Sequence, residues 1–276
     1  TVLMVLAAIF APLLAPQNPF NPSELRLMDA FAPPGTEAIS GEMVYWLGAD
    51  GQGRDIFSAI LYGSRISLLV GVSAVLFAMI LGTGLGLYAG YRGGWPDAVI
   101  MRIVDVQLTF PSILVALLIF GVVSNVMPAG DRAQAALIVL VVSIGLSDWV
   151  HYARTVRGAT MVEKTKEYVQ AGHVIGLPAR TILARHVLPN VMRPVLVIAT
   201  IGLALAIIAE ATLSFLGVGM PPTQPSLGTL IRVGQDYMFS GEWWITFFPA
   251  LALLALALSV NLLGDWLRDV LNPKLR

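Results

Sequence analysis

Long runs of apolar residues recur along the chain and are separated by shorter polar segments. Three runs contain no Asp, Glu, Lys or Arg, and two more contain a single acid, Asp148 or Glu210. In chain order the five runs cover residues 66–89, 106–127, 133–153, 194–217 and 243–264. A helix that crosses a membrane needs about 20 apolar residues. Each run therefore predicts one membrane-spanning helix.

The apolar run at the start of the chain, residues 2–14, is shorter and would rise only about 20 Å as a helix. We expect it to be the outer part of a first membrane helix that begins ahead of Thr1. A cleaved signal peptide fits less well, because no small-residue cleavage site precedes Gln17 and Asn18 and five more apolar runs follow. The pattern therefore predicts six spans.

The basic residues are sorted unevenly between the two sets of connecting segments. Segments 90–105, 151–193 and 265–276 hold 12 of the 17 Lys and Arg residues, and the alternate segments hold the other five. Basic residues concentrate in cytoplasmic loops. We therefore expect these three segments and both termini to be cytoplasmic. The outer segment, 15–65, contains five prolines and predicts extended or turn structure.

The long inner segment, 151–193, has a helix-compatible composition. It predicts a first helix over 160–175, a left-handed stop at Gly176, and a second short helix over 179–187 that Pro189 ends. A helix of about ten residues is marginal in water unless it packs against something. Its own bundle, the membrane surface and a cytoplasmic partner protein are the alternatives.

The composition excludes several classes of function. The chain is 57% hydrophobic and 12% charged, and its formal net charge is zero, which argues against a nucleic-acid binder. The sequence has no cysteine, so disulfides, thiolate metal sites and cysteine nucleophiles are excluded. No lysine follows a glycine as a P-loop requires, and neither His-Glu-x-x-His nor Gly-x-Ser-x-Gly occurs. We expect no catalytic, cofactor-binding or metal-ligating residues.

The inner segment also carries a specific motif: Tyr168-Val-Gln-Ala-Gly172, then Gly176, then Arg185-His-Val-Leu-Pro-Asn190. This pattern resembles the cytoplasmic EAA loop of bacterial ABC-importer permeases, in the variant found in dipeptide and oligopeptide systems. Gln170, Gly172 and His186 replace the Glu, Ala and Ile of the general pattern, and these departures suit the peptide branch.

Four further blocks resemble the same family in the same order, and together they cover most of the chain from residue 47 onward. They are Leu47-Gly48-Ala49-Asp50 with Gly53-Arg54-Asp55, Ser58, Gly63, Arg65 and Ser67-Leu68; Gly90-Tyr91-Arg92-Gly93-Gly94 with Asp97, Met101-Arg102 and Asp105; Phe215-Leu-Gly-Val-Gly219 with Pro221 and Pro222; and Gly264-Asp265 with Leu267-Arg268-Asp269 and Asn272-Pro273-Lys274. The resemblance implies an all-α membrane protein with six transmembrane helices, the type I ABC importer permease fold, and a cytoplasmic coupling helix between spans 4 and 5.

The same resemblance implies a transport subunit without its own nucleotide site, forming half of a translocation path for di- and oligopeptides delivered by a binding protein. Its partners would be a second homologous permease subunit in a heterodimer, two ATPase subunits that bind ATP and Mg, an extracytoplasmic solute-binding protein and the lipid of the bacterial inner membrane. Nickel chelates and glutathione are alternative cargoes. An ion-coupled secondary transporter is the alternative class, although the two halves of the sequence show no repeat.

On this interpretation the chain has four parts. They are a first transmembrane helix, 1–14; an extracytoplasmic Pro-rich segment, 15–65; a permease core of five transmembrane helices, 66–268, that includes the coupling segment 160–190; and a cytoplasmic tail, 269–276. The residues implied to contact the ATPases are Gln170, Ala171, Gly172, Gly176, Arg180, Ile182, Leu183, Arg185, His186 and Pro189. Arg180 and Arg185 are expected at the rim of that contact, and Ile182 and Leu183 as its buried anchor.

Acids inside predicted spans are candidates for the path or its gating, because a membrane interior penalises charge. Asp148 has two interpretations: a structural role, through an ion pair with Arg154 or an interhelical hydrogen bond, or a gating role. Glu210 either faces the path or packs between helices. Asp105 and Asp148 would also suit an intramembrane aspartyl protease, but the Gly-x-Gly-Asp context is missing, and Arg102 and Arg154 are near enough to neutralise both acids.

Overall fold

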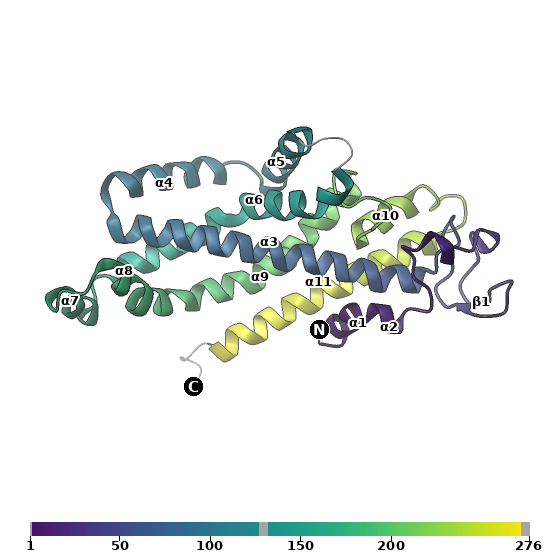
Figure 1. Ribbon diagram of the computed structural model, residues 1–276, viewed down its shortest axis with the longest axis horizontal. Coiled ribbons are helices and arrows are strands. Elements are labelled where there is room, and N and C mark those ends of the chain that lie inside the picture. Colours follow the sequence, from purple (N-terminus) through teal and green to yellow (C-terminus); the bar gives the residue numbers. More distant parts are fainter. Residues whose placement is uncertain (1, 127–131, 272–276) are drawn as a thin grey trace.

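Four long helices dominate the computed structural model, which describes residues 2–126 and 132–271. They are α3 (Ile56–Arg92), α6 (Arg132–Glu163), α9 (Leu188–Phe215) and α11 (Trp244–Leu271), and they run roughly along the long axis of the molecule (Figure 1). Among the described residues, four helices are long and apolar enough to cross a membrane, or five if one bent pair counts as a single span. The all-α membrane class is confirmed, and the count of six spans stays a prediction.

Short elements occupy the two ends of the bundle (Figure 1). Toward the end that carries residues 15–55 lie α1 (Val2–Ile9), which starts nearer the middle, α2 (Ala11–Leu14), the 3-10 turns Pro22–Glu24 and Leu27–Asp29, the antiparallel strands β1 (Thr36–Glu37) and β2 (Val44–Tyr45), and α10 (Leu227–Gln235). Those at the opposite end are α7 (Glu167–Val174), α8 (Ala179–Ile182) and a π-helical turn, Leu183–Val187. The outer segment is irregular, as its prolines predict.

The outer segment is fastened to the starts of two long helices. Helix α3 begins ten residues before its apolar run because the Asp55 carboxylate caps it, accepting a hydrogen bond from the Ser58 N–H at 2.8 Å. Burial raises the pKa of this Asp55 carboxyl. The indole N–H of Trp244 donates to the Ala49 carbonyl at 3.1 Å where α11 starts. The outer segment therefore moves with α3 and α11.

The apolar run over residues 106–127 does not form one continuous helix. That prediction is wrong for the described residues, which reach 126. Helix α4 (Gly94–Leu108) ends first, and α5 (Ser112–Val126) then sets off at 101° to it. Pro111 lacks the N–H that would continue the hydrogen-bond ladder and disfavours helical geometry in the residue before it. Two bent halves replace one straight span.

Glycines bring α3 against α6 at backbone distance. A Cβ atom added at Gly86 would lie 2.5 Å from the carbonyl oxygen of Ala153, and one at Gly90 would lie 2.7 Å from that of Arg157. Gly82 meets α6 in the same way, whereas a Cβ atom at Gly84 would meet nothing within 4 Å. Gly82, Gly86 and Gly90 thus form the small-residue packing surface typical of membrane helices, and Gly84 lies outside it.

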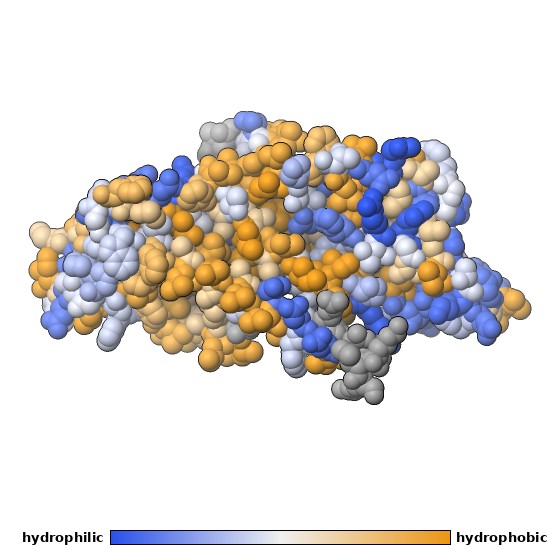
Figure 2. Space-filling view, turned by 180° about the vertical axis from the view of Figure 1, so that it is seen from behind, coloured by the Kyte–Doolittle hydropathy of each residue, from blue (hydrophilic) through white to orange (hydrophobic). Residues whose placement is uncertain are grey.

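Apolar side chains cover the outside of the bundle between its two ends. Figure 2 shows hydrophobic residues across the middle of the molecule and hydrophilic ones gathered toward the ends. Exposed large side chains such as Ile80, Leu118 and Leu254 belong to this band. Such a surface suits lipid or another membrane subunit rather than water.

The glycine surface predicts opposite outcomes for two neighbouring substitutions. Gly86→Ala is expected to lower the free energy of unfolding by about 1–3 kcal/mol, because its methyl group overlaps the α6 backbone. Gly84→Ala is the matched control and is expected to be neutral or slightly stabilising, because alanine favours helix. The thermal midpoint of the purified protein in detergent measures both. Equal midpoints for the two variants would contradict this packing.

Candidate functional site

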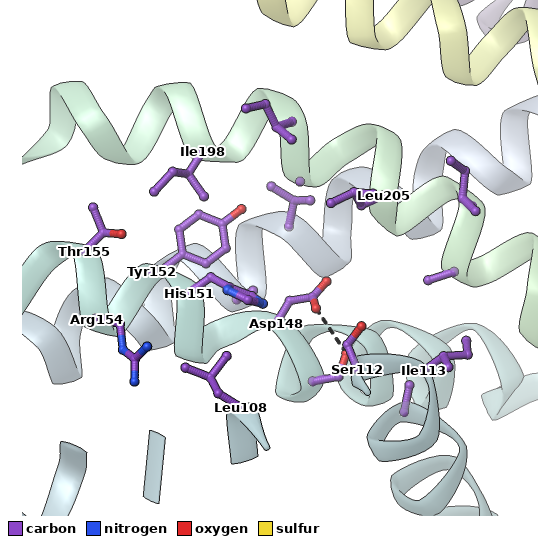
Figure 3. Close-up of a pocket in the computed structure, with 18 of the residues that line it drawn as sticks. Leu108, Ser112, Ile113, Asp148, His151, Tyr152, Arg154, Thr155, Ile198 and Leu205 are labelled. Atoms are coloured by element: carbon purple, nitrogen blue, oxygen red, sulfur yellow. Dashed lines mark hydrogen bonds between the residues drawn. The ribbon is translucent and has the colours of Figure 1, made fainter. Parts of the chain in front are cut away.

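An open cavity of about 940 Å³ lies between α6 and α9, and residues of α3, α4 and α5 complete its lining. Most of its lining is apolar, including Val75, Ile113 and Leu205. The polar side chains on it are Ser112, Ser147, Asp148, His151, Tyr152, Arg154, Thr155 and Thr212. Figure 3 shows the labelled residues around this space. A mainly apolar cavity of this size with a few polar groups has the character of a small-molecule site.

The polar groups are concentrated on one face of α6. Asp148, His151, Tyr152 and Thr155 stand at positions i, i+3, i+4 and i+7, which share a face of an α-helix. In Figure 3 the Asp148, His151 and Tyr152 side chains lie toward α9. The opposing wall on α9 carries Thr212 and otherwise only apolar residues. We call these four α6 residues the polar stripe.

Asp148 is not paired with Arg154, so the structure does not support the ion-pair alternative. Arg154 forms its ion pair with Asp105 on α4. Six residues correspond to about one and two-thirds helical turns, so Arg154 projects from a different side of α6 than Asp148. The hydrogen bond that Asp148 makes within the described chain is a long one, 3.5 Å from the Ser147 hydroxyl.

Tyr152 adds a buried hydroxyl without a hydrogen-bond partner to the same stripe. Its side chain is 2% exposed, and its hydroxyl has no hydrogen-bond partner among residues 2–126 and 132–271. The hydroxyl lies directly against α9, where a Cβ atom added at Gly202 would be only 2.8 Å away. Gly202 therefore allows the tyrosine to reach the α9 backbone.

Glu210 lies away from the cavity, in a closed polar cluster nearer the outer end. It is fully buried and accepts hydrogen bonds from the hydroxyls of Ser67 on α3, at 2.7 Å, and Ser214 on α9, at 2.6 Å. The Ser67 oxygen also accepts from the N–H of Leu227, the first residue of α10. This position favours the packing alternative over the path alternative for Glu210.

The inner segment forms two helices, with boundaries that differ from those predicted. Helix α6 continues to Glu163, and α7 begins only at Glu167, so the expected single helix over 160–175 is interrupted. Gly176 ends α7 with φ +83°, as predicted. The Gly176 N–H donates to the His173 carbonyl and the Leu177 N–H to the Gly172 carbonyl, both at 3.0 Å. These two bonds form a Schellman cap.

Pro189 does not end the second short helix. Helix α8 continues through the π-helical turn Leu183–Val187 directly into α9. The Leu188 N–H reaches back five residues to the Leu183 carbonyl. Pro189 then falls in the first turn of α9, where a missing N–H is tolerated. The segment is therefore a rigid extension of α9.

Ile182 cannot be an anchor for another protein in this conformation, so that expectation is also wrong. It is 0% exposed and packs with Val169 and Val187, holding α7 against α8. Leu183 is half-buried in the same cluster. The exposed apolar side chains here are those of Val174, 88% exposed, and Ile175, 76% exposed.

We define the tip surface as the exposed residues at this end of α7 and α8: Gln170, Ala171, Val174, Ile175, Gly176 and Arg180. Arg185 is also exposed, while Gly172 is buried and His186 is half-buried with its ring stacked near Tyr168. Burial and the neighbouring Glu163 carboxylate raise the pKa of Tyr168. The signal that sequence reasoning missed was the pair of adjacent apolar residues just before the Gly176 cap.

Comparison with known families gives one match, over residues 82–276, to the family described as binding-protein-dependent transport system inner membrane component. The dipeptide transport system permease protein DppC of Haemophilus influenzae is 38% identical over 275 residues, which covers 100% of this chain and 88% of that protein. The glutathione transport system permease protein GsiD of Pectobacterium atrosepticum is 41% identical over 232 residues, 84% of this chain and 73% of that protein. The oligopeptide permease OppC of Bacillus subtilis is 35% identical over 275 residues, 100% of this chain and 83% of that protein.

Solved structures show the same fold. A chain of the inward-facing MetNI methionine ABC transporter superposes with a TM-score of 0.58 at 20% identity, covering 79% of this chain and 98% of that one. A chain of an amino acid ABC transporter crystallised with histidines gives 0.55 at 13% identity, covering 77% and 94%. The predicted type I ABC importer permease fold is confirmed.

The natural absence of cysteine allows a direct test of the cavity. Thr155→Cys, on the cavity wall, is expected to react with a water-soluble thiol reagent, whereas Val156→Cys, the next residue, is 0% exposed and is expected to stay unmodified. Mass spectrometry of the labelled protein measures both. Modification of the Val156 variant at the rate of the Thr155 variant would contradict the cavity geometry.

Proposed function

Since the chain belongs to the family of binding-protein-dependent transport system inner membrane components, we propose that it is a permease subunit of an ATP-driven importer for dipeptides and oligopeptides. The observation that carries the proposal is the likeness over the whole chain to relatives named as dipeptide and oligopeptide permeases, at 35–38% identity. The sequence has no P-loop, so ATP and Mg would be bound by two ATPase subunits.

The chain is a multi-pass protein of the inner membrane, as its family and its apolar helices indicate. We place both termini in the cytoplasm, because the basic residues gather in the segments on that side. The end of the bundle with α7 and α8 is then cytoplasmic, and the end with the outer segment faces the solute-binding protein (Figure 1).

The cavity between α6 and α9 is, in this proposal, one half of the translocation path. A second homologous permease subunit would supply the other half, making a heterodimer. The mixture of an apolar α9 wall and the polar stripe on α6 supports this assignment, because a path must release its cargo as readily as it accepts it. Asp148 lies about halfway along α6, where a passing solute would meet it.

The tip surface would dock on an ATPase subunit. Its exposed Val174 and Ile175 provide the apolar contact, and Arg180 and Arg185 provide polar contacts at the rim. Ile182 acts from inside by fixing α7 to α8. Because α7 follows α6 and α8 is continuous with α9, movement of the tip surface would move both walls of the cavity as rigid bodies.

Uptake measurements test the proposal directly. The chain, reconstituted in proteoliposomes with its second permease, ATPases and binding protein, is expected to import labelled dialanine only when ATP is hydrolysed. A non-hydrolysable ATP analogue is the control and is expected to abolish import. Import driven by a proton or sodium gradient without ATP would instead establish an ion-coupled transporter.

Glutathione is a second candidate cargo, because one relative that covers 84% of this chain is named as a glutathione permease. The same assay with labelled glutathione and labelled dialanine, each with the binding protein loaded separately, compares the two cargoes. ATP-dependent import of glutathione alone would move the assignment to that cargo without changing the transport class.

The docking proposal makes a separate prediction. Ile175→Asp is expected to remove most of the ATPase that copurifies with the chain, because it places an unpaired charge in an apolar contact. Ile39→Asp is the matched control: Ile39 is equally exposed, at 74%, but lies at the opposite end, and its substitution is expected to leave copurification intact. Retention of the ATPase by the Ile175 variant would refute docking through the tip surface.

A further inference from the structure

The Asp148 carboxyl group forms no ion pair with a basic side chain of the described residues. The ion pairs in the described part of the chain join Arg26 to Glu42, Arg154 to Asp105 and Arg157 to Asp97, so none of them involves Asp148. Its hydrogen bond to the Ser147 hydroxyl is 3.5 Å long and supplies no positive charge. Acids within membrane helices are costly unless something pairs with them. The position therefore calls for a cationic partner, and no ion pair within residues 2–126 and 132–271 supplies one.

The other walls of the cavity also supply no ion-pair partner for Asp148. The lining residues from α3, α5 and α9 carry no charge, and Arg154 is held by Asp105 on the α4 side. His151 is the remaining titratable base on the stripe; it lies one helical turn from Asp148 and forms no ion pair with it among the described residues. The cavity therefore presents one carboxyl group without an ion-pair partner.

A second polar group of the stripe lacks a hydrogen-bond partner among the described residues. The Tyr152 hydroxyl, four residues beyond Asp148 on the same face, is buried without a hydrogen-bond partner among the described residues. Buried polar groups are nearly always paired in folded proteins. An acid without an ion-pair partner and a hydroxyl without a hydrogen-bond partner thus stand on one face of one helix, beside a cavity that can hold a ligand.

We propose that Asp148 receives the primary ammonium group of a peptide as it passes through the path. This inference rests on the proposed transport function and adds its recognition chemistry. Every unmodified peptide carries an amino-terminal ammonium group, so a contact with that group tolerates any side-chain sequence. The cavity of about 940 Å³ has room for a short peptide beside the carboxylate.

A metal cation suits the site less well than an organic one. Divalent cations take several oxygen or nitrogen ligands, and no group of three or more His, Asp or Glu side chains gathers anywhere in the described residues. A single carboxylate in a mainly apolar cavity matches one ammonium group, which a charge-assisted hydrogen bond would hold.

Photolabelling of the nucleotide-free complex tests this contact without the binding protein, whose own recognition would otherwise intervene. The probe is alanyl-photoleucine, a dipeptide with a diazirine in its second side chain, and its N-acetyl derivative carries a neutral, slightly larger amide in place of the ammonium group. Labelling of α6 and α9 by the free amine is expected to exceed labelling by the acetylated form about tenfold, the ratio equivalent to one charge-assisted contact.

The variants separate charge from structure. Asp148→Asn is expected to abolish the preference for the free amine, and Asp148→Glu, which keeps the charge, is expected to retain it. Asp236→Asn removes an exposed acid outside the cavity and serves as the matched control, with the preference unchanged. If the Asp148→Asn protein fails to assemble, the wild-type comparison of the two probes and the Asp148→Glu protein still decide the question.

Several outcomes would overturn the inference: equal labelling of the wild type by both probes, no labelling of α6 or α9, a preference that persists in Asp148→Asn, or displacement of the probe by Ni²⁺ but not by dialanine. The last outcome would assign Asp148 to a metal cargo. The uptake assay reads the transport function separately, so ATP-dependent import with an unchanged preference in Asp148→Asn would reject the inference and leave the function standing.

Discussion

The close contact between α3 and α6 is the constraint on which the rest of the structure depends. Lipid gives membrane helices no hydrophobic reason to associate, so their contact relies on close packing. Gly82, Gly86 and Gly90 provide it along three successive turns and hold α6 in one rotational setting. In that setting the polar stripe faces α9 and the cavity. Larger side chains at these positions of α3 would prevent the close contact, and α6 could then rotate so that Asp148 no longer faces the cavity.

The two walls of the cavity lead to the same end of the molecule. Helix α6 passes through a short turn into α7, and α8 passes without interruption into α9. Ile182 locks α7 and α8 together. The site where cargo would pass and the site where force would be applied are thus joined by two helices and one small apolar cluster, with no long flexible connection between them.

Hydropathy and local capping rules predicted the parts of the fold that depend on local chemistry. The apolar runs located α3, α6, α9 and α11, and the glycine rule located the end of α7 at Gly176. The bend at Pro111 was missed because the run around it is apolar on both sides, and hydropathy does not register a lost backbone donor. Pro189 was over-interpreted because a π-helical turn places it where proline is harmless.

The arrangement of the site residues depends on tertiary contacts, which the spacing of residues along the sequence does not reveal. Asp148 was recognised as costly, but its partner was misassigned because α4, carrying Asp105, lies on the far side of α6 and takes Arg154. The burial of Ile182 follows from the folding of α7 back over α8, which helical periodicity does not reveal.

The π-helical turn at Leu183–Val187 has a consequence for how the chain tolerates the deletion of a residue. It accommodates one extra residue within the helix, so deleting a residue there would restore ordinary helical spacing and leave the part of α9 beyond it facing the same way. A deletion in a regular turn of α9 would instead rotate everything beyond it by about 100° and turn Glu210 and the cavity wall away from their present neighbours.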